Sequence, residues 1–290
     1  MKLKPGDDNL TFRRYLFLKM LYYYENKFIN IPFDRCFHFN CDNNRLSDGN
    51  DKIDIVSVAF NNDYVIQLQI KYIRKFITDS NYTFLVADNS DDPEKQKAIQ
   101  DVCKKENVGY VCLPEISKKF SRKFGSYSHG TALNWIYYNY VDKRKPDCFA
   151  LLDHDIFPTQ SVSIKSKIGS QGFYGYKRTS DDFWFLWPGL LFFDYKQISH
   201  FQVNFLPMMK REQYLDTGGS LYNAFYSRLD DKEFFFPELK RVSLTELGYT
   251  NTAQVDFIDN NLWFHSANAS YWRKVDPYMD LIEEIINKHC

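Results

Sequence analysis

The first half of the chain alternates between short apolar runs and longer amphipathic stretches. The apolar runs are rich in β-branched side chains, as strands buried on both faces are, and they lie at 53–60, 82–87, 108–113 and 149–152. The amphipathic stretches have the length and start signals of helices, and they lie at 64–77, 93–106 and 127–141. This rhythm predicts an α/β fold with a mostly parallel central sheet and helices on both of its faces.

The pattern is less regular outside this region. We expect strands near 172–176, 183–193, 234–236 and 261–264, and helices at 215–228 and 279–288. Before the regular part, 11–31 has a helical pattern, and 32–51 is rich in Asn, Asp, Ser and Gly, as linkers are. The chain therefore divides into an N-terminal helical extension with its linker at 1–52, a regular part at 53–160 and a less regular part at 161–290.

The N-terminal helix combines apolar and basic residues. Large apolar side chains recur every four positions at Phe12, Leu16, Met20 and Tyr24, and four Lys or Arg residues lie among or after them. Such a helix can pack on the core of the protein, or it can lie on a membrane surface as a peripheral contact through residues 11–31. No stretch has the charge-free apolar core of a transmembrane helix or a signal peptide.

Polar side chains follow three of the expected strands. Asn61 and Asn62 come after the first strand, Asp88-Asn89-Ser90 after the second, and Asp153-His154-Asp155 after the fourth. The carboxyl ends of parallel strands meet at one edge of a sheet, where open α/β folds bind ligands. The three groups therefore predict one binding site, although each taken alone could be only a turn former.

The two carboxylates of Asp153 and Asp155 carry the strongest chemical signal. Two acids one residue apart repel each other unless a cation or a proton neutralises one of them. Carboxylate oxygens beside a loop suit Mg²⁺ or Mn²⁺, which bind through a few carboxylates and the phosphates of a substrate. The pair therefore indicates a metal-assisted reaction on a phosphorylated substrate. The alternative is a strand-end turn in which the acids only cap a helix.

Composition narrows the choice of partners. Lys plus Arg and Asp plus Glu both number 37 in 290 residues, so no net basic charge points to nucleic acid. Aromatic residues make up 18% of the chain, which suits contact with sugars or a lipid interface beyond what the core needs. The six cysteines form no Cys-x-x-Cys pair, and we expect a reducing compartment, the cytoplasm.

Four segments resemble the GT-A fold glycosyltransferases, and among them the family 2-like enzymes. They are 56–62 (VSVAFNN), 86–90 (VADNS), 130–134 (GTALN) and the triplet Asp153-His154-Asp155, which looks like the Asp-x-Asp motif of that family. The resemblance covers 53–160 well and the remainder loosely. It implies a GT-A (Rossmann-like) nucleotide-diphospho-sugar transferase fold, with 53–160 as the nucleotide half and 161–290 as the acceptor half.

The resemblance also implies roles for single residues. The donor would be bound by Phe60, Asn62, Asp88, Asn89, Asn134 and Asp153, with Asp88 on the base and Asp153 on the ribose or the metal. Asp155 would ligate Mn²⁺ or Mg²⁺ on the diphosphate. Because a carboxylate can accept from the imide N–H of uracil, a UDP-sugar is the favoured donor, and guanine, which offers a comparable pair of N–H groups, is the alternative base. The acceptor would be a hydroxyl of a glycan or a glycolipid.

The acceptor side departs from the family pattern, because the Glu-Asp pair that often provides the base is missing. Asp216 stands in its expected place, and a carboxylate there could deprotonate the acceptor in an inverting displacement. Alternatively, Asp216 caps a helix that includes 221–228. Trp187, Gly189 and Asp182 are expected at the acceptor.

His265 follows an expected strand and resembles the late histidine that several GT-A enzymes bring to the metal or the diphosphate. Imidazole is an acceptable Mn²⁺ ligand beside carboxylates. The alternative is a buried, hydrogen-bonded histidine without a ligand role.

Two other functional classes stay open. A haloacid dehalogenase-type phosphohydrolase also uses an Asp-x-Asp pair at a strand end, although that family has it on the first strand. A non-catalytic nucleotide- or sugar-binding module could keep the fold without turnover. Hydrolysis of the donor with metal present would separate a transferase from such a module.

Overall fold

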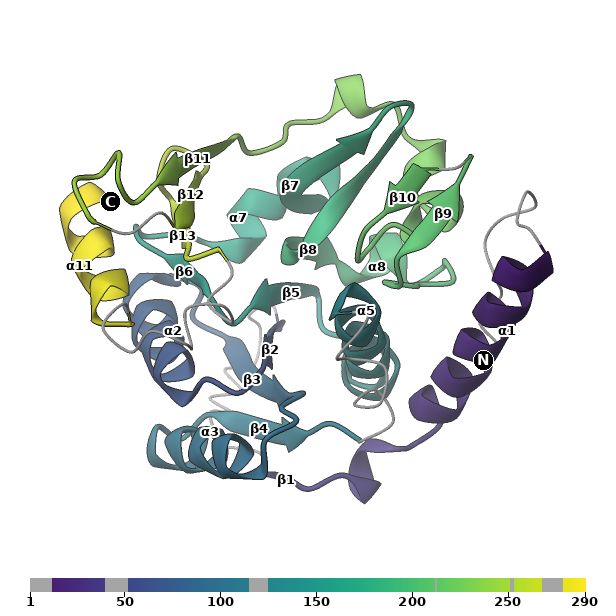
Figure 1. The fold of residues 1–290 in the computed structure, drawn as a ribbon, viewed down its shortest axis with the longest axis horizontal. Coiled ribbons are helices and arrows are strands. Elements are labelled where there is room, and N and C mark those ends of the chain that lie inside the picture. Colours follow the sequence, from purple (N-terminus) through teal and green to yellow (C-terminus); the bar gives the residue numbers. More distant parts are fainter. Residues whose placement is uncertain (1–11, 40–51, 115–124, 212, 251–252, 268–278) are drawn as a thin grey trace.

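A seven-stranded sheet in the order β1-β4-β3-β2-β5-β8-β7 organises the molecule (Figure 1). The computed structural model describes residues 12–39, 52–114, 125–211, 213–250, 253–267 and 279–290. Within the sheet, four neighbouring strands are parallel: β4 (Gly109–Cys112), β3 (Tyr82–Asp88), β2 (Ile53–Ala59) and β5 (Cys148–Asp153). Val56 pairs with Leu85 on one side and with Leu151 on the other, so the four strands predicted for the first half share one sheet.

Antiparallel strands extend this parallel centre on both sides. The edge strand β1 (His38–Phe39) pairs with β4, while β8 (Phe183–Asp194) pairs with β5 and with β7 (Phe173–Ser180). Both β7 and β8 were expected as strands. Their hairpin brings the aromatic-rich strand β8 next to the strand that ends in Asp153.

Helices cover both faces of the sheet, as the alternating pattern predicts. The face with Ile53 and Ile55 packs against α2 (Asp63–Phe76) and α3 (Pro93–Lys105). The face with Val56 and Val58 packs against α5 (Gly125–Ile136), which continues as a π-helical turn at Tyr137–Val141. In Figure 1, α1 (Phe12–Ile29) lies on the same side as α5.

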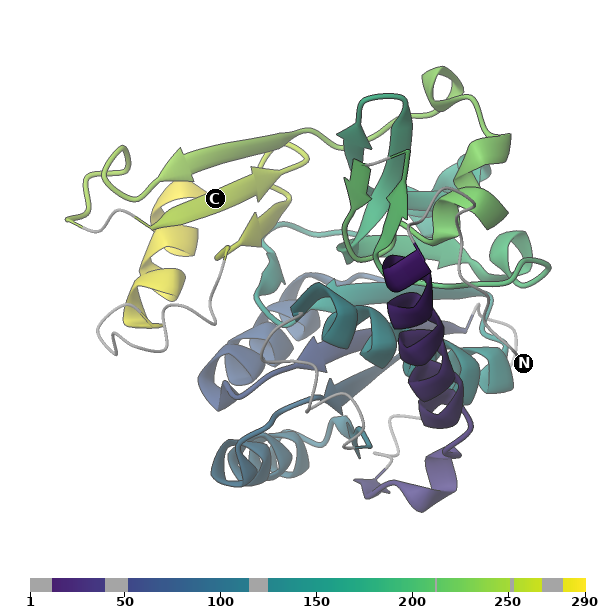
Figure 2. The ribbon, with the colours of Figure 1, turned by 45° about the vertical axis from the view of Figure 1, so that its right-hand side comes forward.

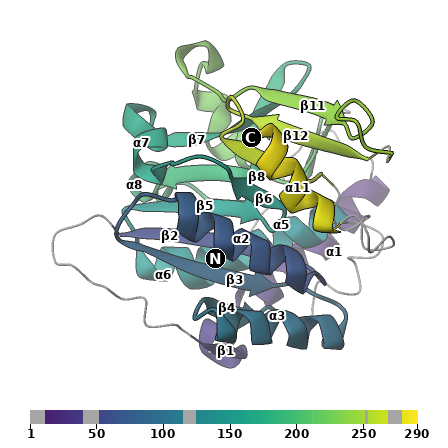
Figure 3. The same cartoon turned by 90° about the vertical axis from the view of Figure 1, so that its left-hand side faces the viewer.

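A second, four-stranded antiparallel sheet lies beside the first. It consists of β11 (Leu239–Ser243), β12 (Gln254–Ile258), β13 (Trp263–His265) and β6 (Ile156–Pro158), and α11 (Met279–His289) packs on it (Figure 3). Only His154 and Asp155 separate β5 from β6. The turn that carries the two acids therefore joins the two sheets.

Two expectations for the second half are wrong. The region 215–228 is not one helix: β9 (Met208–Lys210) and β10 (Gln213–Leu215) form a hairpin, and α9 (Leu221–Ala224) is a single turn. Gly218 has a φ of +94°, which ends any helix at that point. The region 234–236 is not a strand either, because Phe234 and Phe236 pack their rings on Phe173 from an irregular segment.

Short helical turns complete the described chain. They are η1 (Phe33–Arg35), α6 (Asp142–Arg144), α7 (Ile164–Ile168), η4 (Gly169–Gln171), α8 (Tyr195–Ile198), η5 (Tyr226–Arg228) and η6 (Asp231–Glu233). The cysteines among the described residues are free thiols. In the described part of the chain, no helix has both the length and the apolar character needed to span a bilayer.

The second half of α1 packs on the core through Leu21, Tyr22, Phe28 and Ile29. Between them Glu25 is only 1% exposed, and its carboxylate accepts hydrogen bonds from Thr131 Oγ1 at 2.7 Å and Asn134 Nδ2 at 3.0 Å. Burial raises the pKa of Glu25 to about 7, although these two hydrogen bonds act in the opposite direction. Glu25 therefore binds a proton in the folded protein at a pH where the unfolded chain has lost it.

This burial predicts how stability depends on pH. Because the folded pKa lies above the unfolded one, stability falls as the pH rises through the range from about 4.5 to 7, and it then stays level. Glu25→Gln should remove this slope and raise the free energy of unfolding above pH 7, by roughly 3 kcal/mol at most. Denaturant unfolding at pH 5 and pH 8 measures it. A Glu25→Gln variant with the same pH slope as the wild type would contradict the assignment.

Candidate active site

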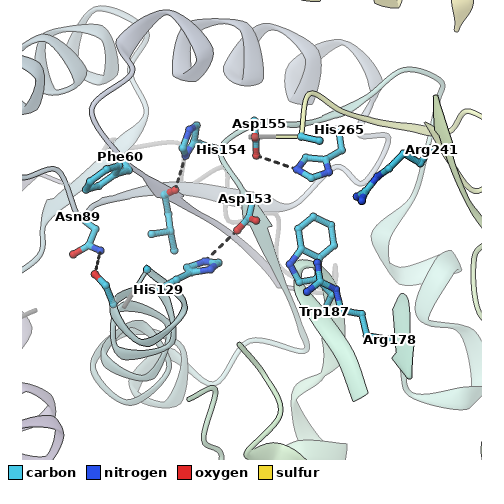
Figure 4. Close-up of a pocket in the computed structure, with 14 residues that line it drawn as sticks. Phe60, Asn89, His129, Asp153, His154, Asp155, Arg178, Trp187, Arg241 and His265 are labelled. Carbon is cyan, nitrogen blue, oxygen red and sulfur yellow. Dashed lines mark hydrogen bonds and ion pairs between the residues drawn. The ribbon is translucent and has the colours of Figure 1, made fainter. Parts of the chain in front are cut away.

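A cavity of about 510 Å³ opens at the carboxyl ends of β2 and β5, between the two sheets (Figure 4). Six residues predicted for the site line it: Phe60, Asn89, Asp153, Asp155, Trp187 and His265. The convergence of three strand ends on one site is therefore present in the structure. His129, Arg178 and Arg241 also line the cavity, and the sequence did not single them out.

The acid turn is held by buried hydrogen bonds from its neighbours. Gln69, on α2, is fully buried, and its Nε2 donates to the carbonyl oxygens of Asp153 at 2.8 Å and Ile156 at 2.9 Å. His154 turns away from the two acids, and its Nδ1 lies 3.1 Å from the Val58 carbonyl oxygen (Figure 4). With the backbone fixed in this way, Asp153 and Asp155 both face the cavity.

Each of the two acids has its own histidine. His129 Nε2, on the first turn of α5, lies 3.1 Å from Asp153 Oδ1. His265 Nε2, on β13, lies 3.6 Å from Asp155 Oδ1. An imidazole nitrogen therefore lies near each of the two carboxylates.

His265 is oriented from behind by a buried carboxylate. Asp256 lies opposite His265 in the β12–β13 pairing, and its Oδ2 is 2.8 Å from His265 Nδ1. The guanidinium group of Arg241 donates two hydrogen bonds to the same carboxylate, at 2.7 and 3.0 Å. Burial alone would lower the pKa of His265, but Asp155 and Asp256 outweigh it and raise that pKa. The Nε2 atom is thus directed at Asp155.

This arrangement fits a divalent cation. Metal-binding histidines ordinarily donate their second N–H to a carboxylate, as His265 does to Asp256. The described residues contain no group of three or more His, Cys, Asp or Glu side chains placed to hold a metal by themselves. Mg²⁺ and Mn²⁺ commonly bind through one or two carboxylates and take their remaining ligands from phosphates and water. Asp155, with His265 and Asp153 near it, can provide the protein's part of such a site.

The other end of the cavity carries an aromatic ring and neutral polar groups. Phe60 follows β2, and Asn89 follows β3. Asn89 Nδ2 donates to Ser128 Oγ, at the start of α5, at 3.1 Å (Figure 4). A ring beside an amide offers a stacking surface and hydrogen bonds without charge.

Three residues expected at the donor do not line the cavity. The carboxylate of Asp88 is buried and accepts from Ser90 N and Tyr110 Oη, both at 2.9 Å. Asn134 is buried against Glu25, and Asn62 caps α2 by accepting from Val65 N. Polar side chains at a strand end can turn into the protein as readily as out of it, and these three make their contacts inside the protein.

Of the residues predicted to contact the acceptor, some lie at the cavity and one does not. Trp187 lies between His265 and Arg178, with its ring centre 4.9 Å from the imidazole and 5.3 Å from the guanidinium carbon. Gly189 makes room for that ring, since a Cβ there would lie 2.1 Å from it. Asp182, by contrast, has an 81% exposed side chain at the tip of the β7–β8 hairpin and is not among the residues that line the cavity.

Asp216 is not among the residues that line the cavity, but it is paired with Arg178, which does line it. Its Oδ2 accepts from Arg178 Nη1 at 2.7 Å, and its Oδ1 accepts from Thr217 N at 2.8 Å. Burial would raise the pKa of Asp216, but hydrogen bonds from Ser126 and Thr217 and the charge of Arg178 together lower it. The expected alternative of a helix cap is wrong, because the N-cap of α9 is Ser220.

Three residues near the two acids are not marked by any local sequence motif. Asp256, Arg241 and His129 have no motif around them, and only strand pairing and the position of α5 bring them to the acids. The one available signal was His129, because it stands at the start of a helix that follows an expected strand.

No family model matches the chain, and no curated protein matches it in sequence. Solved structures with a similar arrangement include three glycosyltransferases. The mannosyltransferase PcManGT from Pyrobaculum calidifontis, in complex with GDP-Man and Mn²⁺, matches with a TM-score of 0.36 and 13% identity over 63% of this chain and 54% of its own. The chain thus spans about half the length of that protein.

The other two are matched at a similar level. The galactosyltransferase LgtC, in complex with donor and acceptor sugar analogues, has a TM-score of 0.32 and 13% identity over 49% of this chain and 58% of its own. The mannosyltransferase Ktr4p from S. cerevisiae has a TM-score of 0.36 and 10% identity, over 68% and 70%.

Proposed function

We propose that this protein is a metal-dependent glycosyltransferase that moves a sugar from a nucleoside diphosphate donor to a hydroxyl of a glycan or glycolipid. The observation that carries the proposal is the meeting of Asp155 and His265 Nε2 at 3.6 Å in a cavity that also contains Arg178 and Arg241. The carboxylate and the oriented imidazole can bind a metal ion, and the two guanidinium groups carry positive charge. Together they suit a metal-bound diphosphate.

The cavity suggests how the donor lies. The base and ribose occupy the neutral end, between Phe60 and Asn89, with Asp153 within reach of the ribose or the metal. The diphosphate lies beside Asp155 and His265, where Mn²⁺ or Mg²⁺ would offset the charge that builds on the leaving nucleotide. A volume of about 510 Å³ is in the range of small-molecule sites.

Asp216 is our candidate for the base in an inverting displacement. Its ion pair with Arg178 keeps the carboxylate ionised, which is the form that accepts a proton. The same pair makes it a weak base, so it suits a transfer in which the acceptor proton leaves late, as an oxocarbenium-like centre develops. Trp187 would offer the acceptor or donor sugar an aromatic face beside this pair.

The two alternatives fit the site less well. A haloacid dehalogenase-type phosphohydrolase needs a free nucleophilic carboxylate on its first strand, whereas Asp153 follows β5 and is paired with His129. A non-catalytic module of the same fold would bind donor and metal without turnover. Release of free nucleotide from a UDP-sugar with Mn²⁺ present would separate the transferase from such a module.

Removal of the Asp155 carboxylate should abolish metal-dependent turnover. Asp155→Ala is expected to lower donor hydrolysis and transfer by at least about 100-fold, with a nearly unchanged melting temperature, because the side chain faces the cavity. Asp182→Ala is the matched control, since it also removes an acid but far from the cavity. Full wild-type activity in excess chelator would contradict a metal role.

Nucleotide selectivity should favour uracil. The amide of Asn89 can both donate and accept, as the imide edge of uracil requires, and Asp88 is committed to Tyr110. Calorimetry with UDP, GDP and CDP should show UDP binding most tightly. Asn89→Ala should weaken it by roughly tenfold, the value of one hydrogen bond. Equal affinities for the three nucleotides in the wild type would end this proposal.

Replacement of Asp216 by Asn should remove basicity while keeping shape. We expect transfer to fall by about 10²–10⁴-fold with nucleotide affinity unchanged. Because the pKa of Asp216 is lowered, loss of activity on the acid side should not be set by protonation of this carboxylate. NMR of the product reports the anomeric configuration: retention of the donor's configuration would refute inversion, and near-normal turnover would refute the base.

A further inference from the structure

We propose that the first half of α1 docks the protein on an anionic lipid bilayer, on the side of the molecule where the cavity opens. Nine large apolar side chains are exposed in the described chain, and six of them lie on this one helix. Exposed apolar residues scattered singly need no explanation, but a cluster on one element marks an interaction surface.

The exposed residues form one face of the helix. Phe12, Leu16, Met20 and Tyr23 follow each other at spacings of four, four and three, and they are 73, 48, 40 and 57% exposed. Such spacing places side chains on the same side of a helix. The residues that hold α1 on the core, from Leu21 to Ile29, lie in its second half. The exposed face of the first half is thus left to a partner.

Charge identifies that partner as an anionic bilayer. The sequence of α1 contains four basic residues, Arg13, Arg14, Lys19 and Lys27, and a single acid, Glu25. That acid is buried, whereas Lys19 and Lys27 are exposed. The chain as a whole has no net charge, so this excess of positive charge is local. Aromatic and aliphatic residues with Lys and Arg, and without exposed acids, are what helices at an anionic lipid surface carry.

Helix packing places this face near the mouth of the cavity. The two helices run in the same direction, since Tyr127 Oη donates to the Leu21 carbonyl and Trp135 Nε1 donates to the Ile31 carbonyl. Ser128 and His129, at the start of α5, line the cavity. Residues 12–20 therefore extend about 13 Å beyond Leu21, past the cavity end of α5, at 1.5 Å per residue.

The proposal gives the helix a role in acceptor choice. A bilayer in contact with Phe12 and Leu16 would lie beyond the end of α5 that lines the cavity, and α11 lies away from α1 on the opposite side of the molecule (Figures 1 and 2). If the proposed transferase activity is correct, a lipid-linked glycan in that bilayer is the acceptor that this geometry favours. Docking itself does not depend on that activity.

Sedimentation with lipid vesicles tests the docking. The full chain should pellet with vesicles in which about a third of the lipid is phosphatidylglycerol, and much less with pure phosphatidylcholine. Combining Phe12→Ser, Leu16→Ser and Met20→Ser should weaken partitioning by at least about tenfold, because each side chain loses apolar area that lipid would bury. The melting temperature should stay close to that of the wild type.

A single pair of substitutions provides the matched comparison. Phe12→Ser should weaken vesicle binding, whereas Phe235→Ser should not, although Phe235 is also a phenylalanine and is 63% exposed. The backbone of Phe235 forms hydrogen bonds with the side chain of Gln171. Gln171 precedes β7, which is an edge strand of the seven-stranded sheet.

Three results would overturn the proposal: no binding to either kind of vesicle, equal binding of the triple variant, or equal losses for Phe12→Ser and Phe235→Ser. Vesicle binding without any donor turnover would leave the docking standing and refute the transferase. Metal-dependent turnover without vesicle binding would support the transferase and refute the docking.

Discussion

The turn between β5 and β6 is the constraint on which the rest of the site depends. Two carboxylates one residue apart must face the same cavity against their mutual repulsion, and the turn must also connect two sheets. The buried amide of Gln69 meets this need by holding the carbonyls on either side of the turn. His129 and His265 then approach the acids from two different elements, α5 and β13.

The second sheet sets the orientation of His265 in the site. Since β13 pairs with β6, the strand that follows the acids also places His265 opposite Ile156. Asp256 and Arg241 come from the next two strands and support His265 one behind the other. A cation held at Asp155 would therefore rest on a side chain whose orientation is set by three paired strands.

The parallel half of the fold could be predicted from the sequence because its signals are local. The apolar runs that became β2, β3, β4 and β5 are short and bounded by polar residues, and Asn62 and Asp92 cap the helices where such residues usually do. The acids at the end of β5 and Asn89 followed from the same reasoning, since parallel strands end at one edge. Phe60 was expected from the family resemblance.

The rest could not be predicted because it depends on contacts between distant segments. Nothing near Asp88 in the sequence shows that Tyr110 would take its carboxylate, and nothing near Asp216 shows that Arg178 would. The aromatic segment at 234–236 has the composition of a strand, yet its rings serve to cover Phe173. The exposed half of α1 was open to two interpretations, and only the packing of its second half shows which face is left uncovered.

The central claim is that Asp155 and His265 hold a divalent cation on the diphosphate of a nucleotide donor. Diffraction from crystals soaked with Mn²⁺ and UDP, measured at the manganese absorption edge, tests it most directly. The account predicts one anomalous peak within bonding distance of Asp155 and of His265 Nε2, with the diphosphate beside it and the base near Phe60. An ordered UDP elsewhere on the protein, or a manganese peak away from both side chains, would contradict it.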